Sequence, residues 1–161
     1  MYNGIDDQRP LALGVITVSV LIALTAAIWP MAGWASWLRP ELATMIVMYW
    51  IIVAPFRVGM TFAWCLGIAV DILEGAVLCQ NALALTLVAY GVSLLRQRIS
   101  MLSIAEQSAV VFLLVVLQHF VNFWVHSLTA GIYFNIAFLV PALVSAILWP
   151  LVKLCLDRLR L

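Results

Sequence analysis

Apolar runs occupy almost the whole of this 161-residue chain and leave only short connections between them. Six runs can be traced, over about 11–29, 41–54, 58–73, 80–95, 103–126 and 133–156. Only 9% of the residues are charged, against about 25% in soluble domains. The sequence therefore predicts an all-α membrane protein, with six transmembrane helices in one compact bundle that forms a single domain over residues 1–161. A cleaved signal peptide is disfavoured for the first run, because acidic residues precede it.

Basic residues orient these predicted helices, because cytoplasmic connections of membrane proteins are rich in Lys and Arg. With both termini in the cytoplasm, Arg39 is alone on the outer side. The other basic residues fall on the cytoplasmic side, namely Arg9, Arg57, Arg96, Arg98, Lys153, Arg158 and Arg160. A five-span chain, with the second and third runs joined across Pro55, scatters these residues over both faces. The pattern favours six spans, with Arg57 and Trp149 as anchors at the inner headgroups.

The third run carries small residues at every fourth position, with an aspartate among them. These positions, which we call the small-residue ridge, are Gly59, Ala63, Gly67, Asp71 and Gly75. They share one face of a helix, and small side chains let a second helix approach closely within a membrane. A charge that faces lipid costs several kcal/mol, so the aspartate is expected to face a helix or a cavity. The ridge is therefore a candidate surface for docking a partner's helix.

Two roles are open for Asp71. As a structural carboxylate it would pair with Arg39 at the outer start of the second helix, or with His126 at the outer end of the fifth. As a functional residue it would bind a proton or a cation, or contact the helix of a partner. The structural pairing is favoured, and both roles are compatible with a latch at the edge of a docking groove. Trp34 and Trp37, in a loop at headgroup level, are expected to complete its outer rim.

The fifth run begins with a capping box, Ser103-Ile104-Ala105-Glu106, and continues into a polar stripe. The stripe consists of His119, Asn122 and His126, which share one helix face and are expected to point into the bundle. A small-molecule-binding or transport subunit is the alternative function. In that case Asp71, His119 and Asn122 would line an intramembrane pocket, and Pro55 and Pro141 would supply helix breaks.

Other chemistry finds little support in the sequence. Asp71, Glu74, His119 and His126 are donor types of metal sites, but the chain has no His-x-x-x-His or Glu-x-x-His pair. No serine or cysteine lies in a nucleophile elbow or beside a recognisable base. The basic residues form no patch for nucleic acid, and the cysteines are widely spaced within apolar runs. The sequence therefore predicts no enzyme activity, no metal and no cofactor.

A series of short motifs resembles the MreD family of rod shape-determining proteins. The motifs are Arg39-Pro40, Tyr49-Trp50, Pro55-Phe56-Arg57-Val58, Gly67, Asp71-Ile-Leu-Glu-Gly75, Ala82-Leu83, Tyr90 and Leu148-Trp149-Pro150. Their order and spacing carry the resemblance, which covers nearly the whole chain and is strongest from Arg39 to Tyr90. One departure is Cys79, at a position where the family tends to have a further glycine.

The resemblance implies a non-enzymatic inner-membrane subunit of the bacterial cell-elongation complex. Such proteins bind the bitopic scaffold MreC and act with the actin-like MreB, the glycosyltransferase RodA and the transpeptidase PBP2 in sidewall peptidoglycan synthesis. The resemblance also implies a bundle similar to the substrate-binding subunits of energy-coupling-factor transporters. The first hypothesis is therefore a scaffold that receives an MreC-like partner on the small-residue ridge and the outer rim.

Overall fold

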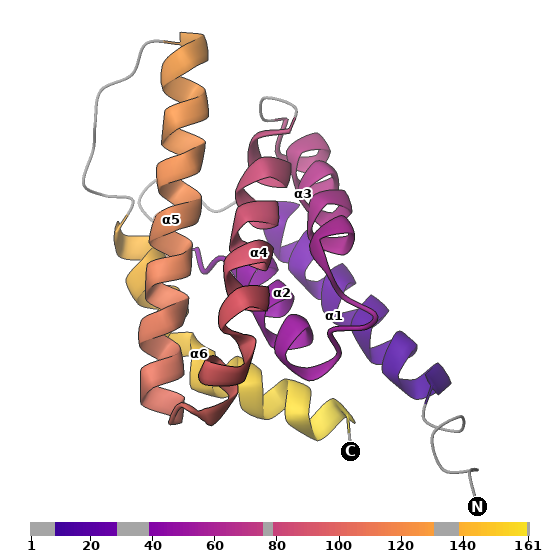
Figure 1. The fold of residues 1–161 in the computed structure, drawn as a ribbon. Helices are drawn as coiled ribbons and strands as arrows, with labels where there is room; N and C mark the ends of the chain where they lie inside the picture. Colours follow the sequence, from indigo (N-terminus) through magenta and orange to yellow (C-terminus); the bar gives the residue numbers. More distant parts are fainter. Residues whose placement is uncertain (1–8, 29–38, 76–78, 131–138, 161) are drawn as a thin grey trace, which may run out of the picture.

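The computed structural model describes residues 9–28, 39–75, 79–130 and 139–160, with the side chains of these ranges except 9–13, 128–130 and 160. The described residues form six α-helices, as predicted (Figure 1). They are α1 (Arg9–Ile28), α2 (Leu42–Val53), α3 (Met60–Glu74), α4 (Gln80–Met101), α5 (Ile104–Ala130) and α6 (Leu139–Arg160). Among them α4, α5 and α6 are long and apolar enough to cross a membrane, and α1 and α2 contain shorter apolar segments.

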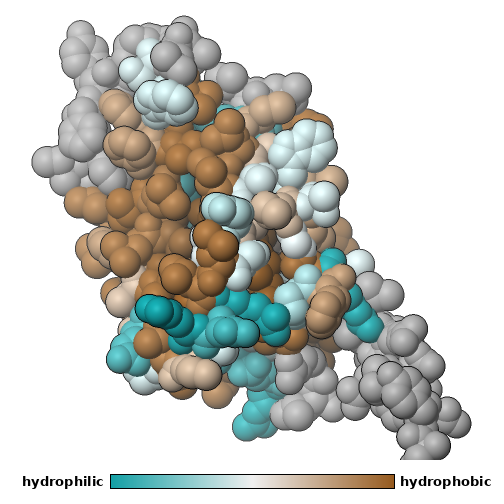
Figure 2. Space-filling view, in the orientation of Figure 1, coloured by the Kyte–Doolittle hydropathy of each residue, from teal (hydrophilic) through white to brown (hydrophobic). Residues whose placement is uncertain are grey.

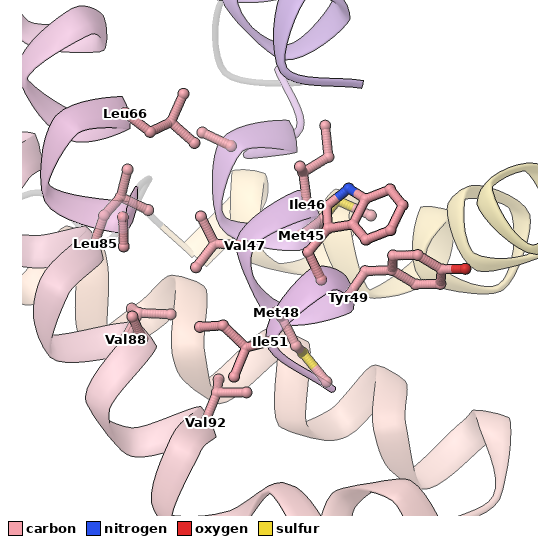
Figure 3. Close-up of a cluster of buried hydrophobic side chains, with 14 of the residues drawn as sticks. Met45, Ile46, Val47, Met48, Tyr49, Ile51, Leu66, Leu85, Val88 and Val92 are labelled. Carbon is pink, nitrogen blue, oxygen red and sulfur yellow. The ribbon is translucent and has the colours of Figure 1, made fainter. Parts of the chain in front are cut away.

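α2 lies in the core of the bundle, and every residue from Ala43 to Ile51 is buried. Figure 3 shows Ile51 of α2 facing Val88 and Val92 of α4. With 12 residues the helix is about 18 Å long, well short of the roughly 30 Å of a bilayer's hydrocarbon core. α2 is therefore too short to cross that core by itself.

The two ends of the bundle differ in charge. The α2–α3 connection and the α4–α5 connection lie at the end of the bundle where α1 begins and α6 ends (Figure 1). We call this the basic end, because it carries Arg57, Arg96, Arg98, Lys153 and Arg158. Figure 2 shows hydrophilic side chains gathered toward this end, below a mainly hydrophobic face. The opposite end, with Arg39 and the start of α4, is called the Arg39 end.

The boundaries of α4 and α5 show which local signals are reliable. The capping box is confirmed, because the Ser103 N–H donates to the Glu106 carboxylate at 2.7 Å and the Glu106 N–H donates to Ser103 Oγ at 3.4 Å. The predicted end of α4 at Leu95 is wrong, since the helix continues to Met101. Arginine is a good helix former, and Arg96 Nε donates to the Ile52 carbonyl at 3.1 Å. This contact anchors the extension on the end of α2.

Pro141 and Trp149 of α6 differ from their predicted positions in the helix and in the bundle. Residues 133–138, where this helix was predicted to begin, lie outside the described residues. Pro141 lies in the first turn of the described helix, where a missing N–H is tolerated, and the proline inside the helix is Pro150. Trp149 is 1% exposed, and its indole N–H donates to Gln107 Oε1 at 3.4 Å. Its predicted role as an interfacial anchor is therefore wrong.

Candidate functional site

Asp71 is buried where α3 meets the first turn of α4. Asp71 is 1% exposed. Its two carboxylate oxygens accept hydrogen bonds from the backbone N–H groups of Asn81 at 2.8 Å and Ala82 at 3.3 Å. The first N–H groups of a helix have no partner within it, and the helix dipole favours an anion there. Asp71 therefore caps α4 from the neighbouring helix, while Cys79, directly before α4, makes no side-chain cap.

The conformation of Cys79 explains why a glycine is expected at this position. Its φ is 72°, and among the described residues it is the one non-glycine residue with a positive φ. Glycine adopts this left-handed conformation without steric cost. The glycine expected here therefore suits the backbone turn into α4.

The middle of the small-residue ridge, from Ala63 to Asp71, is occupied within the chain. A Cβ atom on Gly67 would lie 2.3 Å from Ala82 Cα, so only glycine fits against α4 at this point. Ala63 is fully buried. Gly59 and Gly75 lie outside α3 as its N-cap and C-cap, and Gly75 has φ 64°. The predicted docking of a partner's helix on this ridge is therefore wrong at Gly67, because α4 takes that place.

Arg39 takes a different partner from the predicted one. Its Nη2 lies 3.6 Å from Glu74 Oε1, one helical turn beyond Asp71. Glu74 Oε2 also accepts a hydrogen bond from Asn81 Nδ2 at 3.2 Å. The predicted pairing of Arg39 with Asp71 is wrong, because the Asp71 carboxylate is held by the amides of α4 and Glu74 is the nearer carboxylate.

A second carboxylate, Glu41, joins the polar stripe of α5 to the start of α2. Glu41 Oε1 lies 3.6 Å from His119 Nε2, and Glu41 Oε2 accepts a hydrogen bond from Gln118 Nε2 at 3.4 Å. The Thr44 hydroxyl donates to Gln118 Oε1. Glu41 was not singled out from the sequence. Its charge directly before a fully apolar helix was the one available signal.

Asn122 of the polar stripe also faces the bundle. Asn122 Nδ2 donates to Asn81 Oδ1 at 2.9 Å, which confirms the predicted inward direction for this residue. Through Asn81 it is linked to Glu74. His126 is half-buried near the end of α5, and its role in a latch stays a prediction.

The two ion pairs, Arg39 with Glu74 and His119 with Glu41, line a cavity of ≈ 220 Å³ at the Arg39 end. Three alanines of α1 form part of its wall, and the chain from Pro40 to Ala43 forms another part. Its charged and polar lining comes from Arg39, Glu41, Glu74 and His119. Arg39 Nη2 and His119 Nε2 are buried nitrogen atoms that make no hydrogen bond with the described groups. The cavity thus holds two carboxylates, one guanidinium and one imidazole, with polar atoms still available to an occupant.

The family model of the rod shape-determining protein MreD matches the chain over residues 8–159. The chain belongs to the MreD family. The Rod shape-determining protein MreD of Haemophilus influenzae is 26% identical over 141 residues, which cover 88% of this chain and 86% of the relative. No solved structure matches the chain, so the expected likeness to energy-coupling-factor subunits stays a prediction. Membership of the MreD family implies a role in rod shape determination, and together with the candidate spans it indicates a membrane protein.

Several residues that carry the MreD resemblance make contacts between helices. Gly67 packs on α4 and Asp71 caps it. The Tyr49 hydroxyl donates to Asp157 Oδ1 at 2.6 Å, and the Trp50 indole N–H donates to Ser19 Oγ at 2.9 Å. These residues therefore hold the bundle together.

The remaining predicted site residues are not brought together. Trp34 and Trp37 lie outside the described residues. Arg57 is exposed in the α2–α3 connection, where its role as an anchor stays a prediction. In the described ranges, no three His, Cys, Asp or Glu side chains are grouped closely enough to hold a metal ion.

Proposed function

We propose that the chain is a non-enzymatic subunit of the bacterial rod complex that docks a bitopic partner of the MreC type. Through this partner it would support the work of MreB, RodA and PBP2 in cell-shape maintenance and sidewall peptidoglycan synthesis. Membership of the MreD family supports the role in rod shape. The proposed location is the inner membrane, with six spans and the basic end in the cytoplasm, because basic residues favour that side.

The observation that carries the docking proposal is the polar cavity at the Arg39 end. In the proposed orientation this end faces the cell wall, where the part of a bitopic partner that follows its membrane helix would emerge. The cavity has two carboxylates against one guanidinium, so it favours a segment that presents a basic side chain. The nitrogen atoms of Arg39 and His119 that make no hydrogen bond with the described groups would gain acceptors from the backbone carbonyls of such a segment.

The size of the cavity weighs against the alternative of a small-molecule or transport subunit. At ≈ 220 Å³ it is smaller than the roughly 300–1,000 Å³ of usual ligand sites, and it suits one or two side chains of a peptide. His119 lines it, but Asp71 and Asn122, which that alternative requires, are not among its lining residues.

Neutralising both cavity carboxylates tests this proposal. In a Glu41→Gln, Glu74→Gln double variant, recovery of the co-expressed MreC-type partner should fall roughly tenfold, since desolvated interface charges contribute strongly to binding. The measurement is copurification from detergent-solubilised membranes at equal amounts of inserted chain.

Glu106→Gln is the matched control, because Glu106 is an exposed carboxylate in the first turn of α5 and glutamine also serves in a capping box. It should leave partner recovery unchanged. Full recovery with the double variant would contradict the cavity as the docking site, and a small molecule that copurifies and is lost in His119→Ala would favour the alternative.

A further inference from the structure

The two carboxylates of the polar cavity differ in their basic neighbours. Glu74 Oε1 lies 3.6 Å from Arg39 Nη2, and a guanidinium is always charged. In the described part of the chain, the basic group paired with Glu41 is His119, whose Nε2 lies 3.6 Å from Glu41 Oε1. An imidazole is charged only when it is protonated. Because charges inside a membrane protein are usually paired, Glu41 is the carboxylate that still lacks a permanent cation.

Glu41 is held in place from two neighbouring helices. Its backbone N–H donates to Ser145 Oγ of α6 at 2.9 Å, and that hydroxyl donates in turn to the Pro141 carbonyl at 2.7 Å. Glu41 Oε2 accepts a hydrogen bond from Gln118 Nε2 of α5. The side-chain orientation of Gln118 is fixed as well, because its Oε1 accepts the Thr44 hydroxyl. A carboxylate that is positioned before binding loses little freedom when a ligand arrives.

Each carboxylate of the cavity has one oxygen without an amide donor. On Glu41, Oε2 is bonded to Gln118 at 3.4 Å and Oε1 is not bonded to an amide. On Glu74, Oε2 is bonded to Asn81 Nδ2 at 3.2 Å and Oε1 is directed to the guanidinium. A further guanidinium would bind a carboxylate best through two parallel hydrogen bonds, which require both oxygens. An ammonium is a compact charge with three rotatable donors, so a single oxygen is sufficient for it.

We propose that Glu41 binds a primary ammonium group, presented by a lysine of the bitopic partner. The ammonium would donate to Glu41 Oε1 inside the cavity of ≈ 220 Å³, while Arg39 keeps its pairing with Glu74. The inference rests on the proposed function for the partner's identity, and it goes further by naming the residue and the chemical group that meet. Charge complementarity favours this occupant, because a cation on Glu41 makes the numbers of permanent positive and negative charges in the cavity equal.

Zero-length crosslinking with a carbodiimide tests the proposal on the full chain in complex with the full-length partner. The reagent joins a carboxylate to an amine and does not join it to a guanidinium. The Glu41 and Glu74 side chains are 28% and 34% exposed, so the reagent can reach both. The chain itself has one lysine, Lys153, and it lies at the basic end. Mass spectrometry should therefore find Glu41 linked to a lysine of the partner.

The crosslink should be lost in Glu41→Gln and kept in the Glu106→Gln control. Crosslinking from Glu74 in place of Glu41 would overturn the assignment. So would a Glu41 crosslink to the amine of a lipid, or no Glu41 crosslink in a complex that still forms.

Partner recovery supplies an independent measurement at equal amounts of inserted chain. Glu41→Gln alone should lower recovery about tenfold, as in the double variant, since the effect of desolvated charges is large. Glu74→Gln should lower it no more than about twofold, because Arg39 already neutralises that carboxylate. Replacing the crosslinked lysine of the partner with arginine should lower recovery about threefold, the effect of one weakened hydrogen bond.

Full recovery with the arginine variant would overturn the preference for an ammonium. Equal losses in Glu41→Gln and Glu74→Gln would overturn the assignment to Glu41 and leave the proposed function standing. Failure of the unaltered chain to recover the partner would overturn both.

Discussion

Replacing Gly67 with alanine is expected to destabilise the bundle more than any other single methyl addition to a described glycine. The new Cβ would lie 2.3 Å from Ala82 Cα and 2.6 Å from Ala82 N, and these are backbone atoms that no side-chain rotation can move. α3 and α4 would have to separate, which also draws Asp71 away from the amides that it caps. Overpacking usually costs 1–3 kcal/mol, and we expect a loss of about 3 kcal/mol in the free energy of unfolding.

Denaturant unfolding in detergent micelles, followed by tryptophan fluorescence, measures this loss. Gly91→Ala and Gly14→Ala are the controls, because neither Cβ would meet a neighbour within 4 Å. Alanine is the better helix former, so both controls should be neutral or stabilising. If Gly67→Ala unfolds at the same denaturant concentration as Gly91→Ala, the contact of α3 with α4 is not as close as described.

Hydropathy predicted the helices because each of them coincides with an apolar run. Their ends depended on finer signals. The capping box at Ser103 and Glu106 is a local hydrogen-bond pattern, so it could be read from the sequence and was confirmed. The end of α4 depends on where Arg96 finds the Ile52 carbonyl, which is a contact with another helix. Hydropathy carries no information about such a contact.

The small-residue ridge shows the same limit for the candidate site. Spacing of four places residues on one helix face and indicates that another helix packs there. It does not say whether that helix belongs to a partner or to the same chain. Short connection length was the missing clue, since α3 and α4 are joined by only a few residues and are therefore natural neighbours. The ridge was correctly read as a helix contact, and its assignment to a partner is wrong at Gly67, where α4 packs.

The cavity could not be predicted, because its charges come from distant parts of the sequence. Glu41 and His119 lie 3.6 Å apart although α3 and α4 separate them along the chain. Neither belongs to a periodic pattern that includes the other. The sequence could predict that charges in such a chain are paired, but the choice of Glu74 for Arg39 depended on the cap that already occupies Asp71.

The second large effect concerns that cap. Replacing Asp71 with alanine is expected to lower the free energy of unfolding by about 3 kcal/mol, because the N–H groups of Asn81 and Ala82 would be left buried without acceptors. Asp71→Asn keeps one acceptor oxygen and loses the charge, so it should cost roughly half as much. Thermal unfolding of the purified chain in micelles would rank the wild type above Asp71→Asn, and Asp71→Ala below both.

Asn81→Ala separates capping from the side-chain network around it. This variant keeps the backbone N–H that Asp71 accepts and removes the amide side chain bonded to Glu74 and Asn122. It should therefore be less harmful than Asp71→Ala. If Asp71 instead bound a proton or a cation, Asp71→Ala should have normal stability. Asp71→Ala and Asp71→Asn should then lose function equally, because both remove the charge. An Asp71→Ala variant as stable as the wild type would reject the cap. The predicted ranking would show that this buried charge is held by a helix N-terminus and acts through the fold.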